Sequence, residues 1–263
     1  MSMEDYSTVP YLQNVLYFLP FDSGDEDNIQ DYIREITKLI VINYQNGQYQ
    51  FAYFGLHLLY MTYIYCTIWK ISQIEPERYK DAILFARSYN GREKDLNIEE
   101  VNSIFDYSLI PETDIAKLFG IIDLNKSQIL NVRSIVSSRN IMAHASGKFD
   151  ILNETAFDVK SNNVITSIKN IHKSMELSIR KWYSNILLCY CSGKYQDYSE
   201  PKDIVKEQMI QNFKLSVNEL LICNQMSIKS LVKEYHDEKG YQYRLKKFKS
   251  AMKNYCQDMG FIE

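Results

Sequence analysis

The sequence predicts an all-α protein, a helical bundle followed by additional helices in its C-terminal part. Turn-forming residues are scarce, because nine glycines and five prolines in 263 residues make up roughly 5% of the chain, against an average near 12%. Apolar residues near the N-terminus recur at helical spacing, at Ile29, Ile33, Ile36, Leu39 and Ile40. The segment 51–69 has no Asp, Glu, Lys or Arg, which fits a central helix that is buried on most sides.

The elements of the N-terminal half follow from their bounding residues. A helix begins near Asn28, after the capping residues 25–28, and the break Asn46–Gln48 separates it from the long apolar helix. Pro76 ends that helix, so the two helices are expected to form an antiparallel pair. The next predicted elements are helices at 79–89 and 98–107, a short helix opened by Pro111 with Thr113 and Asp114 as caps, and a helix at 123–144.

The C-terminal half is predicted to be helical as well. Residues 145–163 read as a loop, and a strong helical pattern resumes from Val164 to Tyr190. The segment Ser192–Pro201 is predicted as a linker, followed by helices at 203–224 and 227–256 with a break at Gly240. These boundaries predict three parts of the chain: an acidic N-terminal leader at 1–27, a helical domain at 28–191 and a helical C-terminal extension at 192–263 with a basic-aromatic segment.

Composition favours a reduced, cytoplasmic protein. The five cysteines are odd in number and irregularly spaced, without a C-x-x-C pair for a zinc site or a disulfide framework. The apolar stretch near the N-terminus follows Glu4 and Asp5 rather than basic residues, so no signal peptide is predicted. Segment 51–69 is long enough for a membrane span, but its tyrosines and His57 lie in its middle, which favours a buried helix and no membrane contact.

A basic segment near the C-terminus is a candidate RNA-binding surface. Lysines and arginine alternate with aromatic residues and no acid between 239 and 256, and such a mixture suits a phosphate backbone and unstacked bases. The alternatives are a solvated helix face and a contact with the acidic leader. The RNA-binding candidates are Arg244, Lys246, Lys247 and Lys249.

Arg139, Asn140 and His144 are the candidate catalytic residues. A histidine can transfer protons near neutral pH, an arginine can stabilise a phosphorane as its charge grows, and an asparagine can orient the imidazole. This chemistry needs no metal or other cofactor, and no clustered Asp, Glu and His set predicts a metal site. The alternative is that these residues are the polar end of a helix. His57 is expected to be a core histidine with satisfied polar atoms, or else a residue beside or in contact with a substrate.

The segment 139–144 resembles the R-x(4 to 6)-H motif of the HEPN superfamily, and the resemblance covers about residues 28–190. It implies a bundle of the HEPN type and a metal-independent endoribonuclease that leaves 2′,3′-cyclic phosphate ends. It also implies a homodimer with a composite active site, and many members act in toxin–antitoxin or antiviral defence systems, with an antitoxin or defence partner. The alternative function is a non-catalytic helical module that binds RNA or protein.

Overall fold

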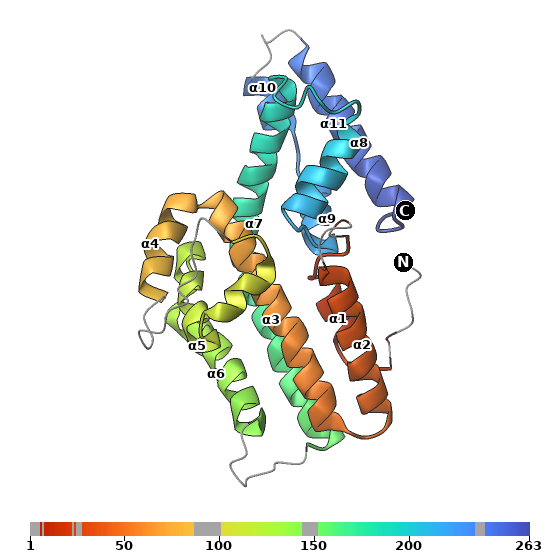
Figure 1. Cartoon of the computed structure of the whole chain (residues 1–263). Coiled ribbons are helices and arrows are strands. Elements are labelled where there is room, and N and C mark those ends of the chain that lie inside the picture. Colours follow the sequence, from red (N-terminus) through yellow and green to blue (C-terminus); the bar gives the residue numbers. More distant parts are fainter. Residues whose placement is uncertain are drawn as a thin grey trace. The chain divides into compact units, whose positions relative to one another are not determined.

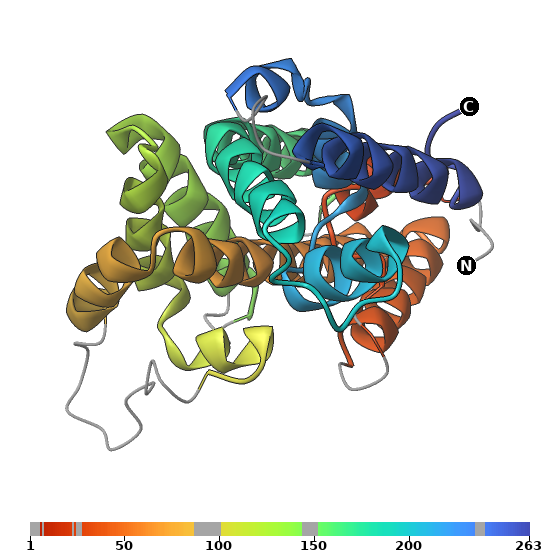
Figure 2. The same cartoon turned by 90° about the horizontal axis from the view of Figure 1, so that it is seen from above.

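All regular elements that the structure describes are helices (Figures 1 and 2). This computed structural model describes residues 6, 8–22, 24, 28–86, 101–143, 152–234 and 240–263. Extended pairing within those ranges is limited to an isolated bridge between Pro20 and Ser216, so the predicted all-α class is confirmed. The chain divides into two compact units. Unit 1 is Met1–Leu19 with Asp27–Ser174, and unit 2 is Pro20–Glu26 with Met175–Glu263.

Helix α3 (Tyr49–Ile74) is the core element of unit 1. Side chains all round it are buried, including the polar residues His57, Thr62 and Lys70. By length and composition α3 is apolar enough to cross a membrane, but 83% of its most apolar window is buried inside the protein. The predicted burial of this segment on most sides is therefore observed.

Helix α2 (Ile29–Gln45) runs antiparallel to α3 and packs closely on it (Figure 1). The predicted break is present, since α2 ends before Asn46 and Gly47 has a φ of 70°. The close approach requires Gly55 of α3, because a Cβ atom there would lie 2.6 Å from Cγ1 of Ile40. The buried stripe differs from the predicted one: Leu39 is 38% exposed, whereas Thr37 is buried and donates its hydroxyl to the Ile33 carbonyl at 2.7 Å.

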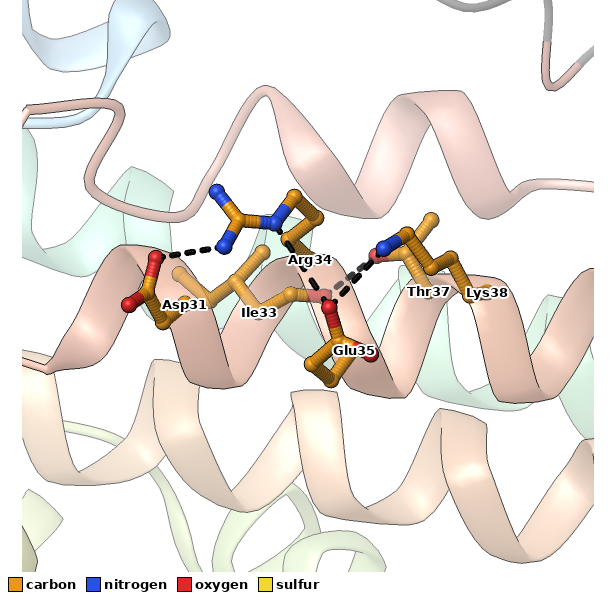
Figure 3. A network of polar contacts seen from close by, with 6 residues as sticks. All are labelled: Asp31, Ile33, Arg34, Glu35, Thr37 and Lys38. Carbon is orange, nitrogen blue, oxygen red and sulfur yellow. Dashed lines mark hydrogen bonds and ion pairs between the residues drawn. The ribbon is translucent and has the colours of Figure 1, made fainter.

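The opposite face of α2 carries a row of alternating charges (Figure 3). Arg34 pairs with Asp31 at 2.7 Å and lies 3.6 Å from Glu35, which also pairs with Lys38 at 2.9 Å. About half or more of each of these side chains is exposed, so solvent screening keeps their contribution to stability small. This face is the solvated side of an amphipathic helix, and Asn28 at its start makes no side-chain cap.

The remaining elements of unit 1 are mostly short. Helix α1 packs on α3 with Leu12 and Val15 buried, so the first part of the predicted leader belongs to this unit. The first part of the predicted helix at 98–107 lies outside the described residues, and from Ile104 the chain forms a 3₁₀ helix, η2. Helix α7 begins at Glu154 rather than at Val164, and the Asn153 side chain before it accepts a hydrogen bond from the Ala156 N–H at 2.8 Å. The element bounds are α1 (Leu12–Leu16), α4 (Pro76–Ala86), η2 (Ile104–Leu109), α5 (Glu112–Ile115), η3 (Ala116–Ile122), α6 (Lys126–Ala143) and α7 (Glu154–Cys191).

Unit 2 contains the last part of α7 and the helices that follow it. The predicted helix at 203–224 is interrupted, because Ser216 and Glu219 form a capping box that starts a new helix. The leader also contributes here, since the Gln211 amide donates to Asp22 at 3.3 Å. The division between units lies within α7, after Ser174, rather than at the predicted 191. The elements are α8 (Pro201–Ile204), the π-helix η4 (Val205–Asn212), α9 (Val217–Gln225), α10 (Lys229–Glu234) and α11 (Tyr241–Asp258).

Two glycine substitutions test the packing of α2 on α3. Gly55→Ala is expected to lower the free energy of unfolding by about 1–3 kcal/mol, because the added methyl group overpacks the contact with Ile40. Gly120→Ala is the control, since nothing lies within 4 Å of a Cβ atom there, and it should be neutral or stabilising by up to about 1 kcal/mol. Urea denaturation measures both; equal stability of the two variants would contradict the close approach.

Candidate functional site

Arg139 lies near the C-terminal end of α6, which ends at Ala143. Its side chain is 20% exposed, and its Nε atom is buried without a hydrogen-bond partner among the described residues. Asn140 follows it on the same helix, and its side chain is outside the described part of the structure. His144 also lies outside the described residues, so the expected grouping of Arg139 with His144 stays a prediction.

The carboxylate of Glu112 connects Arg139 to a buried histidine. Glu112 is the first residue of α5, and its Oε1 atom accepts a hydrogen bond and ion pair from Nη2 of Arg139. Its Oε2 atom lies 3.6 Å from Nε2 of His57, which is completely buried in α3. The three charged or titratable groups come from three helices, so the fold of unit 1 brings them together.

A second polar group adjoins this one. Ser138 precedes Arg139 on α6, and its hydroxyl accepts a hydrogen bond from Nζ of Lys160 at 2.7 Å. The Lys160 ammonium also lies 5.3 Å from the centre of the Tyr53 ring, a favourable cation–π distance. Tyr53 is one turn before His57 on α3. With His57 neutral, Arg139 and Lys160 outnumber Glu112, and the combined group carries one excess positive charge.

Burial and the neighbouring charges set the protonation of the site. Desolvation lowers the pKa of His57 below its ordinary value of 6.5; Glu112 opposes this effect in part, and Arg139 adds to it. Burial by itself would raise the pKa of Glu112, but His57 and Arg139 outweigh it and hold that pKa below 4.5. The pKa of Tyr65 on the same helix is raised by burial and by the Glu112 charge. At neutral pH the site therefore contains a neutral imidazole, a carboxylate and a guanidinium.

Sequence reasoning missed Glu112 as a site residue. The local signal is visible, because Pro111 starts the helix and a carboxylate is favoured in a first turn, but only Thr113 and Asp114 were expected to act there. Nothing in the sequence places Glu112 against helices α3 and α6. His57 was expected to have satisfied polar atoms, yet within the described residues neither ring nitrogen has a hydrogen-bond partner.

The four predicted RNA-binding residues lie on α11 and differ in their surroundings. Arg244 donates from Nη1 to the Cys191 carbonyl, and Lys249 donates to the Cys223 carbonyl at 3.0 Å and to the Asn224 carbonyl. Lys247 pairs with Glu200 at 3.2 Å, and Lys246 is exposed. Two of the four, Arg244 and Lys249, therefore cap helix ends within unit 2.

The described ranges contain no group of three or more His, Cys, Asp or Glu residues that could hold a metal ion.

The buried imidazole predicts a pH dependence of stability. Unfolded His57 takes up a proton near pH 6.5, whereas the folded form resists it, so stability should fall with pH below about 6.5, by at most about 1.4 kcal/mol per pH unit for this proton. The folded protein favours the charged form of Glu112, so the stability that this carboxylate contributes is lost only as pH falls below 4.5 towards its lower folded pKa. His57→Gln should flatten the slope between pH 6.5 and 5 in urea denaturation series; an unchanged slope would contradict this assignment.

A double-mutant cycle measures the Glu112–Arg139 pair. Glu112→Gln, Arg139→Gln and the double variant should give a coupling free energy of about 1–3 kcal/mol, because both side chains are mostly buried. The exposed pair Asp31–Arg34 is the matched control, with an expected coupling below about 0.5 kcal/mol. The assignment fails if the two couplings, measured by chemical denaturation, are the same.

The site is thus defined by its own geometry, with Arg139, Glu112 and His57 in contact across three helices. The neighbouring Lys160 and Ser138 extend it along α6 and α7. Comparison of the chain with protein-family models, with curated proteins and with solved structures finds no match.

Proposed function

We propose that the chain is a metal-independent endoribonuclease whose reaction centre contains Arg139, Asn140 and His144. The observation that carries this proposal is the position of Arg139. Its side chain is 20% exposed near the end of α6, and its guanidinium is paired through Nη2 with the carboxylate of Glu112. A phosphate group at the exposed side would meet a cation that is already oriented, which is the arrangement that favours electrostatic stabilisation of a transition state.

The proposed reaction uses the 2′-hydroxyl of the RNA as the nucleophile. His144 takes its proton as the oxygen attacks the adjacent phosphorus, and a protonated imidazole supplies a proton to the departing 5′-oxygen. Arg139 stabilises the added negative charge on the phosphorane, and Asn140 orients a phosphate oxygen or the imidazole. The products are a 2′,3′-cyclic phosphate and a 5′-hydroxyl, so the reaction consumes no water and needs no metal-bound nucleophile.

Glu112 and His57 have supporting roles in this proposal. His57 is fully buried and cannot touch the RNA, so it acts by packing against the carboxylate of Glu112. Glu112 restricts the rotamers of Arg139, which lowers the entropy lost when the guanidinium meets a phosphate. The excess positive charge contributed by Lys160 favours an anionic substrate.

The remaining parts of the proposal concern assembly and location. We propose a homodimer in which the motifs of two protomers face one cleft, and a role as a toxin or antiphage-defence effector with an antitoxin or defence partner. A cytoplasmic protein without membrane contact is supported by the five free cysteines and by the burial of most of α3. The second candidate function, a non-catalytic binding module, is favoured by the lysines of α11.

RNA cleavage in the presence of EDTA tests the proposal. Arg139→Ala and His144→Ala are each expected to lower the rate by about 10² or more, because each removes a group that acts in the transition state. Arg133→Ala is the matched control, since Arg133 is exposed on the same helix and should leave the rate unchanged. Gel analysis of 3′ ends should show cyclic phosphates, and circular dichroism verifies folding. Unchanged cleavage in both folded active-site variants would overturn the nuclease assignment.

A further inference from the structure

A hollow of about 290 Å³ lies within unit 2, between the C-terminal end of α9 and one face of α11. Helix α11 contacts both α9 and α10 (Figure 1). Three of the lining residues are lysines, and the others are neutral. The lining residues are Asn224, Ile228, Lys246, Lys249, Ser250 and Lys253.

The lysines of this hollow share one face of α11. Lys246, Lys249 and Lys253 are spaced three and four residues apart, which places their side chains along the same side of the helix. Like charges at this spacing destabilise a helix unless an anion lies between them. Lys246 and Lys253 are exposed, and neither has an acidic partner in the described part of unit 2.

Lys249 has a different task from the other two lysines. The C-terminal end of α9 presents backbone carbonyl groups, whose partial negative charge would repel an anion. The Lys249 ammonium donates to the carbonyls of Cys223 and Asn224 and so neutralises this end. Lys246 and Lys253 remain available to a ligand, and the repulsion that the helix end would cause is removed.

Another face of α11 has the opposite character. It borders a hollow of about 520 Å³ whose lining includes Glu200, Asp203 and Asp258. The lysine there, Lys202, is paired with Asp258 at 2.7 Å. Acids are thus gathered on one side of the helix and unpaired lysines on the other, so the charge around the smaller hollow is not a property of the whole helix.

We propose that the smaller hollow is a phosphate-binding site. The ammonium groups of Lys246 and Lys253 bind the phosphate oxygens, and the Ser250 hydroxyl and the Asn224 amide are within the same lining to donate further hydrogen bonds. The phosphate can belong to the backbone of a single RNA strand or to a free phosphorylated small molecule. This site does not involve Arg139 or His144, so it is independent of the nuclease proposal.

Binding measurements on the full chain test this site with two probes. The first probe is a fluorescent single-stranded 2′-O-methyl RNA of twelve nucleotides, which cannot be cleaved by its own 2′-oxygen and whose binding is measured by its fluorescence. The second probe is pyrophosphate, whose binding is measured by calorimetry. Lys246→Glu combined with Lys253→Glu should weaken binding at least about tenfold, and for RNA it should lower the salt slope of the affinity by about 1 to 1.5. Lys206→Glu is the control, because Lys206 is exposed on η4 and outside the hollow.

The outcomes separate the source of the phosphate. If the double variant loses binding of the RNA alone, the site binds the backbone of a strand; if it loses binding of pyrophosphate alone, the site binds a small phosphorylated ligand. If it loses binding of both probes, the site recognises the phosphate group in either source. The proposal is overturned if the wild-type protein binds neither probe, if the double variant binds as tightly as wild type, or if Lys206→Glu weakens binding equally. Lys246→Gln with Lys253→Gln, which removes charge without reversing it, should give a smaller loss in the same direction.

Discussion

The burial of α3 is the constraint on which unit 1 depends. A helix of 26 residues with apolar or aromatic side chains on every face must be covered on all sides to remain in water. Helices α1, α2, α4 and α6 and the 3₁₀ helices pack on it, and Gly55 allows α2 to approach more closely than any side chain would permit. His57 is carried into the core by the same packing, which is why a titratable group is found at 0% exposure.

That burial also explains how a polar site can exist beside an apolar core. An imidazole without hydrogen bonds is unfavourable in such surroundings, and the neutral form is the less unfavourable of its two states. Glu112 enters at the rim of the core from α5, where its side chain is 24% exposed, and its two carboxylate oxygens face the buried His57 and the partly exposed Arg139. Exposure within the site therefore increases from His57 in α3, which is 0% exposed, to Arg139 and Glu112, whose side chains are 20% and 24% exposed.

The sequence was informative where periodicity and turn residues acted locally. The helical pattern from Ile29 and the break at Asn46–Gln48 gave α2 and the start of α3 closely, and Pro76 marked the end of α3. The start of α7 was placed too late, because the capping role of Asn153 and the buried Phe157 were not recognised. The interruption before α9 had a visible signal in Ser216 and Glu219, a capping box. Glu112 had none, because its partners are distant in the chain and its role arises only from packing.

The Glu112 bridge has a consequence for genetic screens. If Arg139 acts as proposed, a search for substitutions that abolish function would recover Glu112 and His57 together with Arg139, because displacing the guanidinium has the same effect as removing it. Burial separates His57 from the other two residues, since a residue that solvent never reaches cannot meet a substrate. Conservative replacements that preserve shape, such as glutamine at Glu112, would separate the residues that orient the cation from the cation itself. The hits of such a screen would thus extend from the buried His57 to the partly exposed Glu112 and Arg139, and of these only the two partly exposed residues could contact a ligand.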